Sequence, residues 1–268
     1  MSSLSVAVED GLTITRRNLV KVRRVPELIV FATLSPIMFV LLFRYVFGSA
    51  IQVPGDLPYA EFLLPGIFAQ TIVFGSTITG AGLAEDLQKG LIDRFRSLPM
   101  ASSAVLVGRT VADLALNAVS IVVMGVTGLL VGWRIRSSLG EALAGIALLL
   151  LFAYAMSWLM ATVGLLVRTP EVVQQASFIV IFPLTFVANT FVPLEGLPSV
   201  LRTFAEWNPI SSVVQASREL FGNTTPAIPV PDAWPLQNPV LYTLIWVAVL
   251  LAVFVPLSVR IYRRTASR

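Results

Sequence analysis

The feature that most constrains this chain is a series of long apolar runs that are almost free of charge. Six runs of 20 to 26 residues lie at 28–47, 62–83, 114–133, 142–167, 172–194 and 240–259. A helix rises about 1.5 Å per residue, so roughly 20 apolar residues cross the ~30 Å hydrocarbon core of a bilayer. The runs lack the strand-like alternation of a membrane β-barrel. The sequence therefore predicts an all-α integral membrane protein with six transmembrane helices.

The composition agrees with burial in a bilayer. Hydrophobic residues make up 56% of the 268 residues and charged residues only 13%, about half the share of charge in a soluble domain. We expect one membrane domain over residues 1–268. Its expected parts are a cytoplasmic interfacial helix (1–27), spans one to five (28–194), an external re-entrant segment (195–239), and span six with a cytoplasmic tail (240–268).

The distribution of basic residues predicts the orientation. Short loops on the cytoplasmic side of a membrane are enriched in Lys and Arg. With six spans, 14 basic residues fall on the side of the two termini and 4 on the other side. The amino terminus is polar and basic and does not resemble a cleavable signal peptide. We therefore expect a multi-pass plasma-membrane protein with both termini in the cytoplasm.

Several kinds of chemistry are missing from the sequence. The chain has no Cys and no His, so thiol chemistry, disulfides and the commonest metal ligand and general base are absent. It also contains no Walker A sequence, and Arg44 is the one charged residue inside the expected spans. A secondary carrier usually holds buried acids or histidines for coupling. We therefore expect a non-catalytic protein without a metal or bound cofactor and with no affinity for nucleic acid, powered by a separate subunit.

Two cytoplasmic segments have the pattern of amphipathic helices. In residues 6–24 the apolar residues fall on one helical face and the basic residues on the opposite face, which predicts a helix in the membrane interface; the alternative is a flexible basic tail. In residues 84–100 apolar residues form a stripe at helical spacing, acids stand near the start and Pro99 near the end. This second helix is either a loop helix without a partner or a docking element for a cytoplasmic protein.

The external segment predicts two short helices. Residues 197–222 contain two amphipathic pieces that are broken at Asn208–Pro209, with Phe204 and Trp207 on the first piece. Gly222 is a plausible C-terminal cap of the second. Both pieces are too short and too polar to span the membrane, but they can dip into the outer leaflet if protein shields their backbone ends.

Uncharged polar residues inside the spans have two interpretations. Most of them are expected to hydrogen-bond neighbouring helices. A subset can instead line a pathway, beside Phe68, Phe74, Phe182 and Phe186, and such an aromatic lining suits an amphiphilic or lipid-like cargo. Arg44 stands near the outer end of span one, where it can snorkel to the headgroups or pair with an acid such as Glu61 or with a lipid phosphate.

Two motifs resemble a known family. The segment GLIDRFRSLPM at 90–100, followed by Val107-Gly108-Arg109, resembles the signature of type-2 ATP-binding-cassette (ABC) transporter permeases. More narrowly, it is similar to daunorubicin-resistance exporter permeases of actinobacteria. The run FVPLEGLPSVLRTFAEWNPIS at 191–211 resembles the proline-rich external motif that follows a fifth span in that family. The resemblance covers nearly the whole chain, in order.

The resemblance implies a permease that pairs with a second, identical or homologous permease and docks a dimer of cytoplasmic ATPase subunits, which bind and hydrolyse ATP with Mg²⁺. Membrane lipids and a hydrophobic drug or lipid cargo are the other implied partners. The implied ATPase-coupling helix consists of Glu85, Asp86, Leu87, Lys89, Gly90, Leu91, Ile92, Asp93, Arg94, Phe95, Arg96, Leu98 and Pro99. The implied external re-entrant helices include Phe204, Trp207, Asn208 and Pro209. The candidate substrate pathway, near spans one, two and five, includes Gln70, Phe74, Thr77, Phe186 and Asn189.

Three functions remain open from the sequence. The leading hypothesis is the permease of an ATP-driven exporter of hydrophobic drugs, including antibiotics, or of lipids. A second is a permease for polysaccharide or a lipid-linked glycan. A third is a secondary carrier or a non-transporting membrane scaffold, and the scarcity of charge inside the spans argues against the carrier.

Overall fold

The structure is a computed structural model that describes residues 11, 13–17, 20, 26–48, 57–91, 102–167, 169–191, 194–228 and 230–265. These ranges contain helices and connecting turns and no strand, which confirms the all-α prediction. The elements are α2 (Pro26–Leu41), a π-helical turn η1 (Leu42–Phe47), α3 (Tyr59–Gly75), α4 (Thr77–Gln88), α6 (Ser102–Leu130), α7 (Leu139–Leu166), α8 (Pro170–Val187), a 3₁₀ turn η2 (Leu194–Gly196), α9 (Ser199–Trp207), α10 (Pro209–Phe221), α11 (Trp234–Gln237) and α12 (Pro239–Thr265).

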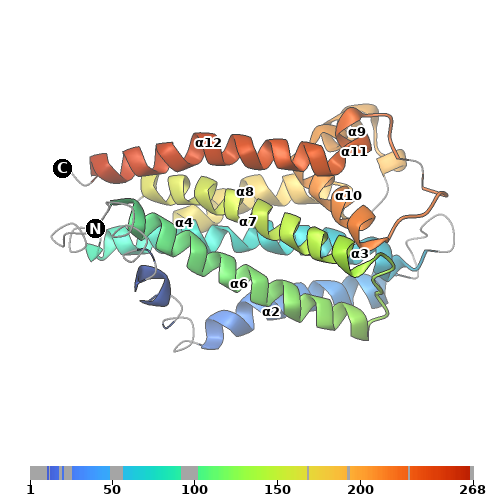
Figure 1. The fold of residues 1–268 in the computed structure, drawn as a ribbon, viewed down its shortest axis with the longest axis horizontal. Coiled ribbons are helices and arrows are strands. Elements are labelled where there is room, and N and C mark those ends of the chain that lie inside the picture. Colours follow the sequence, from blue (N-terminus) through green and yellow to red (C-terminus); the bar gives the residue numbers. More distant parts are fainter. Residues whose placement is uncertain are drawn as a thin grey trace.

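The long helices run along one axis and the short helices gather at one end (Figure 1). We call the end that holds α9, α10 and α11 the capped end. The opposite end, where α12 ends at Thr265, is called the terminal end. Residues 13–17 form a short helical segment near the terminal end. The capped end and the terminal end are therefore separated by the length of the long helices.

In the described ranges five helices are long and apolar enough to cross a membrane. They are Tyr59–Gln88, Ser103–Leu130, Leu139–Leu166, Pro170–Val187 and Pro239–Arg264, and Thr33–Val46 is a shorter apolar helix. The second predicted span, 62–83, lies within the helix pair α3–α4. The fifth, 172–194, is too long, because α8 ends at Val187 and residue 188 is already extended.

Two helices form the centre of the bundle. All residues of α3 from Tyr59 to Val73 are buried, and α7 packs against α3, α4, α6, α8, α10 and α12. Both helices are largely apolar and have no distinct polar face, as expected of helices enclosed by other helices or lipid. By contrast, α12 exposes most of its apolar surface, with Leu241, Leu244 and Val253 each more than 40% exposed.

Glycines allow α4 and α7 to approach each other closely. A Cβ atom built on Gly164 of α7 would lie 2.2 Å from the backbone oxygen of Gly80 in α4. A Cβ on Gly80 would lie 2.7 Å from the backbone oxygen of Met160. Small residues at such contacts let helix backbones pack tightly inside a membrane, where the hydrophobic effect does not drive helices together.

The buried Ser and Thr hydroxyl groups of the described helices mostly donate to carbonyls of their own helix, where bonds to neighbouring helices were expected. The hydroxyl of Thr185 donates to the carbonyl of Ile181 at 3.0 Å, and that of Thr162 donates to Trp158 at 3.2 Å. The amide nitrogen of Asn117 donates to the carbonyl of Asp113 at 3.1 Å. Short polar side chains reach the carbonyl four residues earlier without any partner helix.

The two short helices predicted within residues 197–222 form, with a break at Asn208. The side-chain oxygen of Asn208 accepts a hydrogen bond from the backbone of Ile210 at 2.9 Å and so caps α10. Gly222 ends α10 with φ +70°, in the left-handed conformation that favours glycine, as predicted. Of the two helices α10 is the buried one, and it packs against α3, α7 and α12.

The glycine contact between α4 and α7 gives a stability prediction. The Gly164→Ala variant should unfold more easily than the wild type, by about 1–3 kcal/mol, because the added methyl group meets backbone that cannot move aside. Gly125→Ala in α6 is the matched control, because a Cβ there meets nothing within 4 Å. Unfolding of purified protein in detergent measures both variants, and an equal effect of the two changes would disprove the close contact.

Candidate functional site

A cavity of about 410 Å³ lies between α2, α3, α4, α6 and α8. Its lining consists of Ser35, Pro36, Phe39, Ile67, Gln70, Thr71, Phe74, Gly75, Ile78, Leu116, Asn117, Ser120, Phe178 and Phe182. We call it the central cavity. Ser35 and Phe178 are exposed, so the cavity reaches the surface of the bundle at α2 and α8. Its size falls within the range of sites for drug-sized molecules, about 300–1,000 Å³.

The lining combines aromatic rings with neutral polar groups. Four phenylalanine rings stand beside the amides of Gln70 and Asn117 and the hydroxyls of Ser35, Thr71 and Ser120. None of the described residues that line the cavity is charged. Gln70 and Asn117 are 6% and 3% exposed, so their amides are largely removed from solvent. Such a surface can stack a flat apolar ligand and orient it by a few hydrogen bonds.

A helix break supports the wall of the cavity. α3 ends at Gly75 and α4 begins at Thr77. At this break the hydroxyl of Ser76 donates to the carbonyl of Val73 at 2.6 Å, and that of Thr77 donates to Phe74 at 2.7 Å. A side chain at Gly75 would collide with Asn117, because its Cβ would lie 2.3 Å from the Asn117 Oδ1 atom. Glycine therefore lets Asn117 come close to the backbone at the break.

A chain of aromatic contacts leads from the central cavity toward the capped end. In α8, the ring of Phe182 lies 4.9 Å from Phe178 and 4.2 Å from Phe186, centroid to centroid. Phe186 lies 4.9 Å from Phe191, and Phe191 stacks on Phe43 at 4.3 Å. We call these five rings the aromatic track. The spacing of four residues between the α8 rings places them on one helix face.

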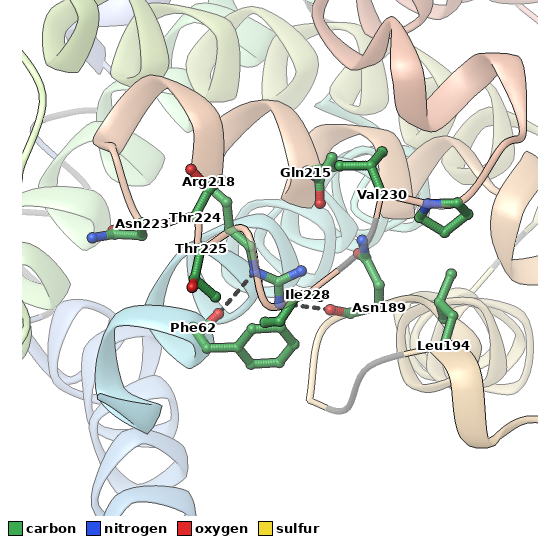
Figure 2. A pocket seen from close by; sticks show the side chains of 11 residues that line it. Phe62, Asn189, Leu194, Gln215, Arg218, Asn223, Thr224, Thr225, Ile228 and Val230 are labelled. Carbon is green, nitrogen blue, oxygen red and sulfur yellow. Dashed lines mark hydrogen bonds between the residues drawn. The ribbon is translucent and has the colours of Figure 1, made fainter. Parts of the chain in front are cut away.

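The five predicted pathway residues are divided among three places. Gln70 and Phe74 line the central cavity, and Thr77 lies at the adjoining helix break. Phe186 belongs to the aromatic track. Asn189 lies apart from them, in a smaller cavity at the capped end (Figure 2).

Part of the lining of the central cavity was not predicted from the sequence, and the ring of Phe68 was expected beside the pathway. Phe39 and Phe178 line the cavity but were not selected from the sequence, although the spacing of Phe178, Phe182 and Phe186 could have indicated a common face. Phe68 was a candidate neighbour of the pathway. It is instead packed in the core, 5.4 Å from the ring of Trp133.

The predicted coupling segment, residues 85–99, is described only in part. Glu85, Asp86 and Leu87 belong to the last turns of α4, so the acids do not begin a separate helix as the sequence suggested. Gly90 has φ +65° and interrupts the helix before Leu91. Ile92, Asp93, Arg94, Phe95, Arg96, Leu98 and Pro99 lie outside the described residues. An ion pair with Glu85 raises the pKa of the exposed Lys89.

A group of charged side chains joins three elements at the terminal end. Arg109 of α6 donates to the carboxylate of Asp113 at 3.1 Å and to the carbonyl of Ile78 at 3.2 Å. It also lies 3.9 Å from Asp86 of α4, and Asp86 lies 3.9 Å from Arg17. We call Arg17, Asp86, Arg109 and Asp113 the charge cluster.

The amino-terminal segment is also packed on α6. Ile14 is buried, and the hydroxyl of Thr15 donates to the carbonyl of Gly108 at 3.3 Å. A Cβ on Gly108 would lie 2.6 Å from the Cβ of Ile14. Together with the charge cluster, this contact ties the amino-terminal segment to the two helices that flank the coupling segment.

The predicted external residues lie at the capped end. Phe204 and Trp207 are about half exposed on α9. The amide of Asn208 donates to the carbonyl of Leu184 at 2.7 Å and so connects the α9–α10 turn to α8. Pro209 is the first residue of α10, a position where its missing N–H is not needed.

A second polar cluster holds the capped end together. Arg136 makes two hydrogen bonds of 2.7 and 2.8 Å to the buried carboxylate of Glu61, and this contact raises the pKa of Arg136. Asn223 accepts from the indole N–H of Trp133 at 2.7 Å. Arg44 donates to the carbonyl of Val131 at 3.3 Å. Glu61 is therefore the partner of Arg136, and the alternative in which Arg44 pairs with Glu61 is wrong.

Comparison with known proteins gives consistent matches along the chain. Residues 10–221 match the ABC-2 type transporter family. The chain is 33% identical to the daunorubicin resistance ABC transporter permease protein DrrB1 of Streptomyces coeruleorubidus, over 97% of this chain and 88% of the relative. It is 25% identical to the probable doxorubicin resistance ABC transporter permease protein DrrC of Mycobacterium tuberculosis, over 97% and 90%. It is 23% identical to the putative transport permease ycf38 of Cyanophora paradoxa, over 81% and 76%.

Proposed function

The chain belongs to the ABC-2 type transporter family, and from this premise we propose that it is the permease subunit of an ATP-driven exporter of hydrophobic or amphiphilic drugs or lipids. The observation that carries the proposal is the central cavity, whose aromatic and neutral polar lining suits a flat amphiphile. Two of the similar proteins are named for resistance to daunorubicin and doxorubicin. We take daunorubicin as the probe of this cargo class.

The cavity can recognise such a molecule by two kinds of contact. Phe74, Phe178 and Phe182 offer ring faces for stacking, which contributes about 0.5–1.5 kcal/mol per ring pair beyond the buried area. Gln70 and Asn117 offer amide groups for oxygen atoms of the cargo. The absence of charge among the described lining residues avoids the cost of removing an ion from water when an apolar molecule enters.

The aromatic track gives this cavity a direction of release. It leads along α8 from Phe178 to the close stack of Phe191 on Phe43. This stack closes the track at the capped end, so outward release requires these two rings to separate. Since the cavity also reaches the surface at α2 and α8, a second permease placed against that surface would enclose the route.

We assign the capped end to the outside and the terminal end to the cytoplasm. The uneven distribution of basic residues supports this orientation. In this arrangement α2 with η1 is the first of six spans and the α3–α4 pair is the second. The helices α9 and α10 then form the external re-entrant segment, with Asn208 protecting the backbone where they meet.

The permease is proposed to bind no cofactor and to catalyse no reaction. A separate dimer of ATPase subunits would bind ATP and Mg²⁺ and dock on the coupling segment at 85–99. The charge cluster supports such a role, because it joins the flanking helices α4 and α6 to the amino-terminal segment. A movement imposed on the coupling segment would therefore reach three elements at once.

One prediction of this function tests the central cavity as the cargo site. In the reconstituted permease–ATPase complex, Phe178→Ala should raise the daunorubicin concentration that gives half-maximal stimulation of ATP hydrolysis by about three- to tenfold, the effect of losing one stacked ring. Ile179→Ala is the control, because Ile179 follows on the same helix, is 71% exposed and does not line the cavity. Equal shifts in both variants, or no shift in either, would contradict the assignment.

Another prediction tests the coupling segment. The double variant Arg94→Glu with Arg96→Glu should lose its partner ATPase during co-purification and keep the melting temperature of the wild type, because these residues are expected to contact the partner. Arg260→Glu with Arg263→Glu makes the same change of charge at exposed positions on α12 and should retain the ATPase. A docking role for residues 94 and 96 fails if both double variants bind the ATPase equally.

A further inference from the structure

Arg218 is a buried cation at the capped end that no acid neutralises among the described residues. It projects from α10 into the smaller cavity, between the start of α3, residues 189–190 and the loop after α10 (Figure 2). It is only 4% exposed. None of the ion pairs within 4.0 Å in the described ranges involves it. Arginine stays protonated in proteins, so its positive charge is held inside the fold.

The known contacts of Arg218 are with neutral groups. Nε donates to the carbonyl of Phe62 at 3.0 Å, and Nη2 donates to the carbonyls of Asn189 and Thr190 at 2.6 and 3.3 Å. The guanidinium carbon lies 3.8 Å from the centre of the Phe62 ring. These contacts position the side chain but supply no negative charge. The two N–H groups of Nη1 have no hydrogen-bond partner in the described part of the chain.

A second polar group in the same cavity also lacks a partner. Asn189 is 6% exposed, and its Oδ1 atom is buried without a hydrogen bond to any described residue. Its Nδ2 atom likewise has no such bond in these ranges. A buried polar group without a partner costs about 1–3 kcal/mol. Rotation of the amide by 180° would present either the oxygen or the nitrogen to the cavity.

The cavity has room and chemistry for one small anion. The cavity volume is about 70 Å³, several times the roughly 10–15 Å³ that one water requires. Thr224 and Thr225 add hydroxyl groups beside Arg218 and Asn189. The buried positive charge of Arg218 lies beside hydrogen-bond donors that have no partner among the described residues. Such a site is complementary to the oxygens of a phosphate, which form strong charge-assisted hydrogen bonds with guanidinium.

We propose that this cavity binds a phosphate group, held by Nη1 of Arg218 and by the side chain of Asn189. The phosphate comes either from a phospholipid headgroup at the membrane surface or from free phosphate in solution. The site is separate from the central cavity and lies where residues 189–190, just after α8, meet α10. Occupation would therefore stabilise the junction on which the capped end depends.

The test measures the melting temperature of the full-length permease purified in phosphate-free detergent buffer. Short-chain phosphatidylglycerol should raise it by about 5 °C when present at about 100 times its Kd, whereas diacylglycerol, which lacks the phosphate, should not. Inorganic phosphate is the third arm. A rise with inorganic phosphate supports binding from solution, and a rise with the phospholipid alone supports the headgroup.

Two variants separate this site from general lipid effects. Asn189→Asp places a carboxylate in the cavity as an internal partner for Arg218 and should abolish the rise without lowering the starting melting temperature. Asn238→Asp makes the same change at the capped end but outside the cavity and should retain the rise. No rise in the wild type, or the same rise in Asn189→Asp, would overturn the proposal.

Discussion

The structure depends on one constraint: the hydrocarbon core of a bilayer contains no water that could form hydrogen bonds with free backbone groups of a helix. An unpaired N–H or C=O in hydrocarbon costs several kcal/mol, so a helix can end or break only where the protein supplies a partner. Three interruptions follow this rule. The hydroxyls of Ser76 and Thr77 donate to the carbonyls at the α3–α4 break. Arg218 donates to the carbonyls just after α8. The side chain of Asn208 donates to a carbonyl of α8 and accepts from the first turn of α10.

These interruptions lie beside the features to which we assign function. The α3–α4 break adjoins the central cavity, where Gly75 admits Asn117 and the helix presents Gln70 and Phe74. The early end of α8 lies next to the smaller cavity. It also lies next to Phe191, the ring of the aromatic track that follows Phe186. At the terminal end, the charge cluster connects α4 and α6, which flank the predicted coupling segment. Cargo recognition, release and coupling would thus use positions where regular helix gives way to side-chain contacts.

The sequence was sufficient for the fold class and for several local features. Apolar runs predicted the long helices, and the Asn208–Pro209 break and the Gly222 cap were predicted from residue types whose conformational preferences are strong. The end of α8 was not predictable, because residues 188–191 are as uncharged as the helix before them and Arg218, which holds their carbonyls, is distant in sequence. For the same reason the ion pair of Glu61 was not predictable, because its partner Arg136 is 75 residues away in the sequence.

The candidate site was only partly accessible to sequence reasoning. Gln70 and Phe74 were selected because polar and aromatic residues in a span stand out, and they do lie together in the cavity. Asn189 has the same character but lies in the smaller cavity. Phe39 and Phe178 look like ordinary membrane-facing residues until the neighbouring helices are placed around them. Which polar residues share a cavity depends on helix rotation, and composition alone does not determine it.

The most direct test of the central claim is photolabelling of the assembled permease–ATPase complex with a photoreactive daunorubicin derivative, followed by peptide mapping. Our account predicts that label appears on α3, α6 and α8 around Phe74, Asn117 and Phe178, and that unlabelled daunorubicin removes it by competition. Competable label confined to the exposed surface of α12, with none on the cavity lining, would contradict the assignment of the central cavity as the cargo site.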